Sequence, residues 1–185
     1  LLVVGAGGGV GSMLVQLARQ LTGLTVIGTA SRPETRAWVS ELGAHHVIDH
    51  TQPMAQQFRA IGIDQVDLVA SLTHTDQHLP EIVAALAPQG KLGLIDDPES
   101  FDPLLLKRKS ISLHWEFMYT RSMFQTADMI EQHRLLTRVA DLIDSGVLRS
   151  TLAARFGAIN AANLRRAHTL LESGKARGKI VLSGF

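Results

Sequence analysis

The first four residues of the chain are Leu-Leu-Val-Val, and five of the next seven residues are glycine: Gly5, Gly7, Gly8, Gly9 and Gly11. Such an apolar run is typical of a buried parallel strand. After Val10, apolar residues recur at the spacing of one helix face, at Leu14, Leu17 and Leu21. Backbone N–H groups and the dipole at a helix start favour a phosphate, and glycines between strand and helix let it approach closely. The motif therefore predicts a dinucleotide pyrophosphate site.

This glycine motif is imperfect, because alignment on Gly8 and Gly11 places alanine at its first glycine position. Glycine turns also occur for purely structural reasons, so the prediction depends on the flanking strand and helix. The predicted contacts to the pyrophosphate are the turn residues Ala6, Gly8, Gly9, Val10 and Gly11.

The end of the second predicted strand indicates which dinucleotide would bind. An acidic residue about 20 positions beyond the glycines accepts the ribose hydroxyls of NAD, whereas a basic residue admits the extra phosphate of NADP. Here the chain carries Ser31 and Arg32 with no acid before Glu34, and Arg36 follows one helical turn later. The alternative interpretation is that Arg32 and Arg36 are solvated surface charges. The planar donor fork of an arginine side chain, however, suits a phosphate. We predict NADP (NADPH) as the cofactor, with His50 at the end of the third strand near the 2′-phosphate.

Two histidines four residues apart, His74 and His78, enclose a carboxylate at Asp76. On one helix face this spacing suits a metal ion. The segment leaves the end of a predicted strand, however, so we expect loop polarity and helix capping by Thr75 or Asp76 instead. We predict no metal site. Neither a Ser-His-Asp arrangement nor paired carboxylates stand out, so the catalytic residues stay unknown and hydrolysis has no support.

The composition bounds the class of protein. The chain has 185 residues, 45% apolar and 19% charged, a formal net charge of +1 and no cysteine. This balance gives no electrostatic reason to expect nucleic acid or an anionic membrane as a partner. Disulfides are excluded, and thiolate zinc sites cannot be built from this chain alone. No signal peptide is visible, so we expect a cytoplasmic location. Since the chain begins abruptly at a strand, we expect it to be a piece of a longer protein.

Strand and helix signals alternate through the first two thirds of the chain. The predicted strands cover 1–4, 25–30, 46–49, 66–72, 91–95 and 110–118, and the predicted helices cover 10–21, 34–42, 53–61, 79–86 and 102–107. Such alternation predicts right-handed crossovers and an α/β fold with a doubly wound, parallel, six-stranded Rossmann sheet.

The remainder has a different rhythm, with a long predicted helix over 127–144, a strand over 152–156, a helix over 160–173 and a final strand over 179–182. The last strand has no obvious partner in the parallel sheet. We predict a nucleotide-binding domain over 1–148 and a C-terminal segment over 149–185.

Several segments together resemble a known family: GAGGGVGS, SLTHTDQHLP, PQGKLGLID, LKRKSISLHWEFMYTRS and GKARGKIVL. They resemble the medium-chain dehydrogenase/reductase superfamily, and within it the zinc-type alcohol-dehydrogenase-like, quinone-reductase branch. The resemblance covers essentially the whole chain. It implies that a GroES-like catalytic domain precedes the nucleotide domain, and that the C-terminal α/β tail returns to that catalytic domain, which is absent from this chain.

The resemblance also implies roles for individual residues. Ser31 and Arg32 occupy the place that holds the 2′-phosphate in NADPH-using relatives, and His50 stands where many of them have a tyrosine. The residues implied at the nicotinamide are Leu72, Thr73, Ile95, Trp115 and Phe117, and Lys179 is near the position of a basic pyrophosphate contact.

The implied activity is hydride transfer from NADPH to a small-molecule substrate, either a quinone or an α,β-unsaturated carbonyl. Alternatives are a zinc-dependent alcohol dehydrogenase, a non-catalytic NADP-sensing protein and, less in keeping with the motifs, a glycine-loop methyltransferase. Zinc ligands of alcohol dehydrogenases lie upstream of this stretch, and the reductase branch generally lacks them. The resemblance further implies a homodimer in which the sixth strands of two copies pair.

Overall fold

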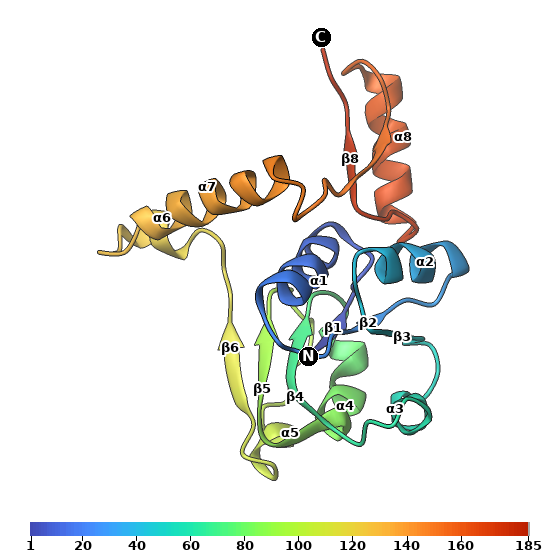
Figure 1. The fold of residues 1–185 in the computed structure, drawn as a ribbon, viewed down its shortest axis with the longest axis vertical. Helices are drawn as coiled ribbons and strands as arrows, with labels where there is room; N and C mark the ends of the chain where they lie inside the picture. Colours follow the sequence, from blue (N-terminus) through green and yellow to red (C-terminus); the bar gives the residue numbers. More distant parts are fainter. Residues whose placement is uncertain (185) are drawn as a thin grey trace.

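Six strands form one parallel sheet in the computed structural model, which describes residues 1–184 (Figure 1). The strands are β1 (Leu2–Val4), β2 (Ile27–Thr29), β3 (His46–Ile48), β4 (Val66–Ser71), β5 (Leu86–Leu94) and β6 (Ser112–Trp115). Their order across the sheet is β3-β2-β1-β4-β5-β6, and every neighbouring pair is parallel. This confirms the predicted doubly wound fold. Strands β2 and β3 lie on one side of β1, and β4 to β6 lie on the other side. Folds of this kind bind their ligands at this switch point between β1 and β4.

Helices cover both faces of this sheet and bury a core on each. They are α1 (Gly9–Leu21), α2 (Pro33–Glu41), α3 (Met54–Ala60), α4 (Thr75–Ala85) and α5 (Leu104–Lys107). Alternate residues of a strand point to opposite faces, and β1 accordingly sends Leu2 and Val4 into the core beneath α3 and α4. Val3 joins the other core, with Val15 of α1 and Val39 of α2. Burial on both faces explains why the strands read as continuous apolar runs.

The rest of the chain extends beyond the sheet. Two helices follow β6, α6 (Thr120–Phe124) and α7 (Ile130–Asp144), and the sequence predicted only the second. Then β7 (Leu152–Arg155), α8 (Ala161–Glu172) and β8 (Lys179–Val181) form a separate unit in which β8 pairs with β7 in parallel. In Figure 1 this unit lies beyond α1 and α2. Within residues 1–184, no helix has the length and apolarity needed to cross a bilayer.

Helix α4 begins at Thr75, four residues earlier than predicted, and the predicted capping by Thr75 or Asp76 is wrong. His74 is the N-cap residue and makes no capping hydrogen bond. The buried Thr75 instead donates its amide and its hydroxyl to the carboxylate of Asp96, over 3.0 and 2.6 Å, and its hydroxyl lies 2.7 Å from that of Ser71. A carboxylate from the end of β5 thus takes the place of a local cap, and it suits the positive end of the helix.

His50 after β3 and His78 of α4 meet edge to face, with ring centroids 5.6 Å apart. Burial lowers the pKa of both imidazoles. The charge of His74 lowers them further, and Asp49 beside His50 opposes the effect, as do Asp76 and Glu81 beside His78. The contact between β3 and α4 therefore favours two neutral rings.

This contact makes the stability depend on pH. Unfolding restores the ordinary pKa of 6.5, so the unfolded chain binds protons that the folded chain excludes. The contribution of these two histidines to the free energy of unfolding is greatest above about pH 6.5, and it declines as the pH falls toward their lowered pKa values in the folded protein. We expect the double variant His50→Gln/His78→Gln to lose less thermal stability than the wild type between pH 7 and pH 5. Part of the slope should remain, because burial also lowers the pKa of His45.

Thermal unfolding across this pH range is the measurement, and His133→Gln on the exposed face of α7 is the matched control. An unchanged slope in the double variant would contradict the assignment to the His50–His78 contact.

Candidate cofactor site

A cavity of about 420 Å³ opens at the carboxyl ends of β1, β2 and β4, on the crevice where the strand order reverses. Its wall combines the glycine turn, the ends of β2 and β4, and residues from the C-terminal tail. The lining residues are Gly5, Gly7, Gly8, Gly9, Val10, Gly11, Thr29, Ala30, Ser31, Arg32, Thr35, His50, Leu72, Thr73, His74, Leu171, Gly174 and Ala176.

The glycines of the turn serve two different purposes. A Cβ atom on Gly11 would overlap the carbonyl oxygen of Gly5 and the backbone of Ala6, so α1 packs directly on the turn only because Gly11 lacks a side chain. Gly5 itself has φ +82°, a conformation that glycine adopts without strain. At Gly8, however, a Cβ atom would meet nothing closer than 3.5 Å. Packing therefore does not require a glycine at position 8, whereas the close approach of a ligand from the cavity would.

Positive potential converges on this turn from two directions. The N-cap of α1 is Gly8, so no side chain caps the helix, and no acidic residue lies in its first turn. The side chain of Lys179 from β8 crosses Gly9, where its Cε and Nζ lie 2.5 and 2.8 Å from the position of an added Cβ atom. Within residues 1–184, Lys179 has no carboxylate within ion-pair distance. A helix start and an unneutralised ammonium together suit a pyrophosphate.

Arg32 at the end of β2 faces the cavity beside Ser31. One guanidinium nitrogen donates to the hydroxyl of Thr35 over 3.1 Å, and Nε lies 3.6 Å from the carboxylate of Glu34. The Arg32 side chain is 30% exposed and that of Glu34 is 56% exposed, so the ion pair is screened by water and worth little. Thr35 therefore orients Arg32, and its guanidinium can still bind an anion of higher charge than the Glu34 carboxylate.

Arg36 of α2 bonds to the backbone beside the cavity. Its guanidinium donates to the carbonyl oxygens of Ala30 and Val47, over 3.2 and 2.8 Å, and it does not line the cavity. Ala30 directly follows β2, and Val47 is the middle residue of β3. Arg36 thus supports the loop that carries Ser31 and Arg32 and makes no direct contact with the space in front of them.

Two histidines, His50 and His74, also line the cavity. The Nδ1 atom of His50 is buried with no hydrogen-bond partner within residues 1–184. His74 has φ +50°, and its Nδ1 lies 2.6 Å from the hydroxyl of Thr73. The left-handed backbone turns the chain sharply at the end of β4, so that His74 lines the cavity and α4 can begin at once.

The cavity unites most of the residues predicted from the sequence, and leaves others outside. Those in its wall are Gly8, Gly9, Val10, Gly11, Ser31, Arg32, His50, Leu72 and Thr73. Ala6 is fully buried in the core beneath α1, and Lys179 lies above Gly9. Ile95, Trp115 and Phe117 follow or end the neighbouring strands β5 and β6, outside the cavity wall.

Sequence reasoning missed several lining residues. Gly5, Gly7, Thr29 and Ala30 adjoin motif positions, and Thr29 accepts the amide of Gly5 over 3.1 Å, so the signal was their proximity to the motif. Leu171, Gly174 and Ala176 come from the tail and carry no local signal. Within residues 1–184, no group of three or more His, Asp or Glu side chains is placed to hold a metal ion.

The sequence matches a family model described as zinc-binding dehydrogenase over residues 42–182. A zinc-type alcohol dehydrogenase-like protein from Staphylococcus aureus (strain MSSA476) is 36% identical over 183 residues, which are 98% of this chain and 54% of that protein. An NAD-dependent alcohol dehydrogenase from Saccharolobus solfataricus is 39% identical over 97 residues, 51% of this chain and 28% of that protein. The chain spans about half the length of the curated relatives that match it throughout.

Solved structures of related proteins are also similar to this chain over almost its whole length. A structure from Rhizobium etli CFN 42, assigned to the zinc-dependent alcohol dehydrogenases, is 59% identical with a TM-score of 0.95 over 100% of this chain and 54% of its own. A mycobacterial protein complexed with NADPH is 27% identical, with a TM-score of 0.81 over 98% of this chain and 55% of its own. The chain therefore belongs to the zinc-binding dehydrogenase family of the medium-chain dehydrogenase/reductase superfamily, and it corresponds to the C-terminal Rossmann part of those longer proteins.

Proposed function

We propose that the protein containing this chain transfers hydride from NADPH to a quinone or an α,β-unsaturated carbonyl, and that this chain binds the cofactor. The observation that carries the NADPH assignment is the charge of the cavity wall at the end of β2. Ser31 and Arg32 line it there, and within residues 1–184 no carboxylate lines the cavity. A site of this kind favours the 2′-phosphate of NADP over the free ribose hydroxyls of NAD.

The surroundings of Arg32 support this preference. Its planar fork is oriented by Thr35, and the exposed Glu34 holds it only through a screened pair, so a phosphate dianion would compete successfully. His50 lines the same cavity, and its buried Nδ1 has no hydrogen-bond partner within residues 1–184. The mycobacterial relative complexed with NADPH favours the same cofactor. The shorter match to an NAD-dependent alcohol dehydrogenase favours the other, which makes cofactor choice the first point to test.

The bound nicotinamide would supply the hydride, and the chain's own residues would hold it in place. In the proposed arrangement the turn around Gly8 and the ammonium of Lys179 hold the pyrophosphate. Leu72 and Thr73 at the end of β4 then border the nicotinamide, with Ile95, Trp115 and Phe117 along the same sheet edge. Positioning of this kind lowers the barrier by keeping the reacting atoms close and excluding water. No catalytic acid is assigned, since the acceptor would lie between this chain and the preceding domain.

A zinc-dependent alcohol dehydrogenase is the second candidate, because the family description and the Rhizobium etli relative both refer to zinc. A third is a protein that binds NADP without turnover. Metal analysis of the full-length protein separates the first two. Stoichiometric, tightly held zinc would overturn the preference for a zinc-independent reductase.

The cofactor assignment predicts that Arg32→Glu weakens NADPH selectively, because it places a negative charge beside the 2′-phosphate. The Kd for NADPH should rise on the order of 30-fold or more, from the loss of a charge-assisted contact and the added repulsion. The Kd for NADH should change by less than about threefold on the same reasoning. Fluorescence titration of the full-length protein measures both. Arg59→Glu, an equal charge change on the exposed side of α3, is the control; equal losses for NADPH and NADH would refute the assignment.

The reaction assignment predicts that the full-length protein oxidises NADPH in the presence of a quinone or a conjugated enone, and leaves simple primary alcohols unoxidised with NADP⁺. Absorbance at the reduced-nicotinamide band follows both reactions across a panel of acceptors. Binding of NADPH without turnover on any acceptor would favour the sensor. Binding of S-adenosylmethionine in place of NADPH would favour a methyltransferase.

We further propose that two copies pair through their sixth strands. In the described chain, β6 bonds to β5 on one side only, and the aromatic and apolar side chains at and after its end are strongly exposed: Trp115, Phe117, Met118 and Tyr119. An open edge with exposed apolar side chains is suited to pairing with another strand.

Pairing of this kind predicts that Ser112→Asp/His114→Asp, at two exposed positions of β6, shifts the full-length protein from dimer to monomer. Like charges on apposed strands destabilise the pair. Light scattering after size-exclusion chromatography measures the mass. Gln52→Asp/Gln56→Asp is the control with the same charge change; a wild type that is monomeric at every concentration would contradict the dimer.

A further inference from the structure

The tail (residues 149–184) contacts the sheet domain at two points. At each point a hydrogen bond joins a backbone group of the tail to a residue of the sheet domain. The first lies at Arg149, between α7 and β7. The second lies at Gly178 and Lys179, where β8 begins. Between them the tail forms its own two-stranded sheet and contributes Leu171, Gly174 and Ala176 to the cavity wall.

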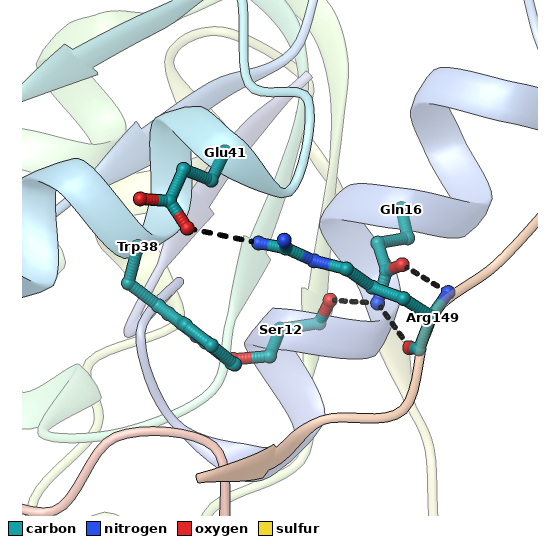
Figure 2. Close-up of polar contacts among 5 residues, drawn as sticks. All are labelled: Ser12, Gln16, Trp38, Glu41 and Arg149. Atoms are coloured by element: carbon teal, nitrogen blue, oxygen red, sulfur yellow. Dashed lines mark hydrogen bonds and ion pairs between the residues drawn. The ribbon is translucent and has the colours of Figure 1, made fainter.

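At the first point, one buried amide of α1 holds both backbone groups of Arg149. Oε1 of Gln16 accepts the Arg149 amide over 2.9 Å, and Nε2 of Gln16 donates to the Arg149 carbonyl over 3.1 Å (Figure 2). Gln16 is only 4% exposed and also donates to the carbonyl of Ser12 over 3.2 Å. A buried polar side chain whose donors and acceptor are all engaged fixes the position of what it binds.

Trp38 of α2 joins the two points of contact. The guanidinium groups of Arg149 and Arg177 both lie over its ring, 5.3 and 5.5 Å from the centroid. Its Nε1 donates to the hydroxyl of Ser12 over 2.8 Å, and Arg149 also forms an ion pair of 3.3 Å with Glu41 of the same helix (Figure 2). The ring thus contacts the tail before β7 and again just before β8.

At the second point the tail meets the glycine turn itself. Gly178 donates its amide to the carbonyl of Gly7 over 2.9 Å, and Lys179 donates its amide to Thr151 over 2.8 Å. A Cβ atom on Gly178 would overlap the carbonyl of Thr151 and lie 3.1 Å from the Trp38 ring, so the backbone is pressed between them. This placement brings the ammonium of Lys179 over Gly9.

We propose that Gln16 and Trp38 are positioning residues for the cofactor: by holding the tail at Arg149 and Gly178, they place Lys179 at the start of α1. This inference rests on the proposed function, since it assumes that the turn and Lys179 bind a pyrophosphate. Docking of the tail and binding of the cofactor then strengthen one another by linkage, although neither Gln16 nor Trp38 contacts the cofactor.

A double-mutant cycle in the full-length protein tests this coupling. Lys179→Met should raise the Kd for NADPH on the order of tenfold, because a charge-assisted contact is lost. Gln16→Met keeps the side-chain volume but removes both bonds to Arg149, and should raise the Kd roughly fivefold when Lys179 is present. In the Lys179→Met background the same change should cost less than about twofold, because the two residues act through one contact.

Two controls separate positioning from general damage. Gln20→Met, an exposed glutamine one turn further along α1, should leave the Kd unchanged. Adenosine 2′-monophosphate has the 2′-phosphate but no pyrophosphate, so Gln16→Met should not change its Kd. Equal weakening of both ligands, or additive effects of Gln16→Met and Lys179→Met on NADPH, would overturn the inference and leave the proposed function standing.

Amide hydrogen exchange of the wild-type protein gives a second test, which does not depend on whether any variant folds. NADPH should slow exchange over residues 175–181, and adenosine 2′-monophosphate should not. Equal exchange with and without NADPH would overturn the inference. A wild type that binds neither ligand would instead refute the proposed function, and the inference with it.

Discussion

The close packing of helix α1 on the first turn is the constraint on which the site depends. A side chain at Gly11 would overlap the carbonyl of Gly5, so the helix can begin directly at the end of β1 only with glycine there. The same geometry leaves the first amides of α1 uncapped beside the cavity. Gly8 has room for a side chain yet faces the cavity, which distinguishes a ligand-binding turn from one shaped by packing alone.

The charge around this turn comes from distant parts of the chain. Arg32 stands at the end of β2, Lys179 arrives from β8, and the helix dipole of α1 adds to both. The charge of Arg32 is only weakly opposed by the exposed Glu34. Arg32 lines the cavity, whereas Lys179 lies beside Gly9 of the turn. The proposed cofactor, NADPH, has negative charge at two separated points, the pyrophosphate and the 2′-phosphate, which would suit this distribution.

The tail has two roles in this arrangement, because it contributes Leu171, Gly174 and Ala176 to the cavity wall and places the ammonium of Lys179 beside Gly9. Its own sheet contains only β7 and β8, which is marginal without further packing. The contacts of Gln16 and Trp38 with Arg149, Arg177 and Gly178 provide that packing on the sheet domain. The buried Gln16 of α1 is explained mainly by its two hydrogen bonds to Arg149, in addition to the one that it donates to Ser12 within the helix.

Local patterns determined much of this protein. The apolar runs, the glycine turn and the alternation of strands with helices were enough to predict the doubly wound sheet and the crevice. The residues Ser31 and Arg32 were predicted from their distance to the motif. Only the tertiary structure decided that Asp96 would start α4 at Thr75, that Arg36 would bind the carbonyls of Ala30 and Val47, and that Leu171, Gly174 and Ala176 would line the cavity. The physical reason is that backbone pattern is local, whereas each of these contacts joins groups whose distance depends on how the strands and the tail are packed.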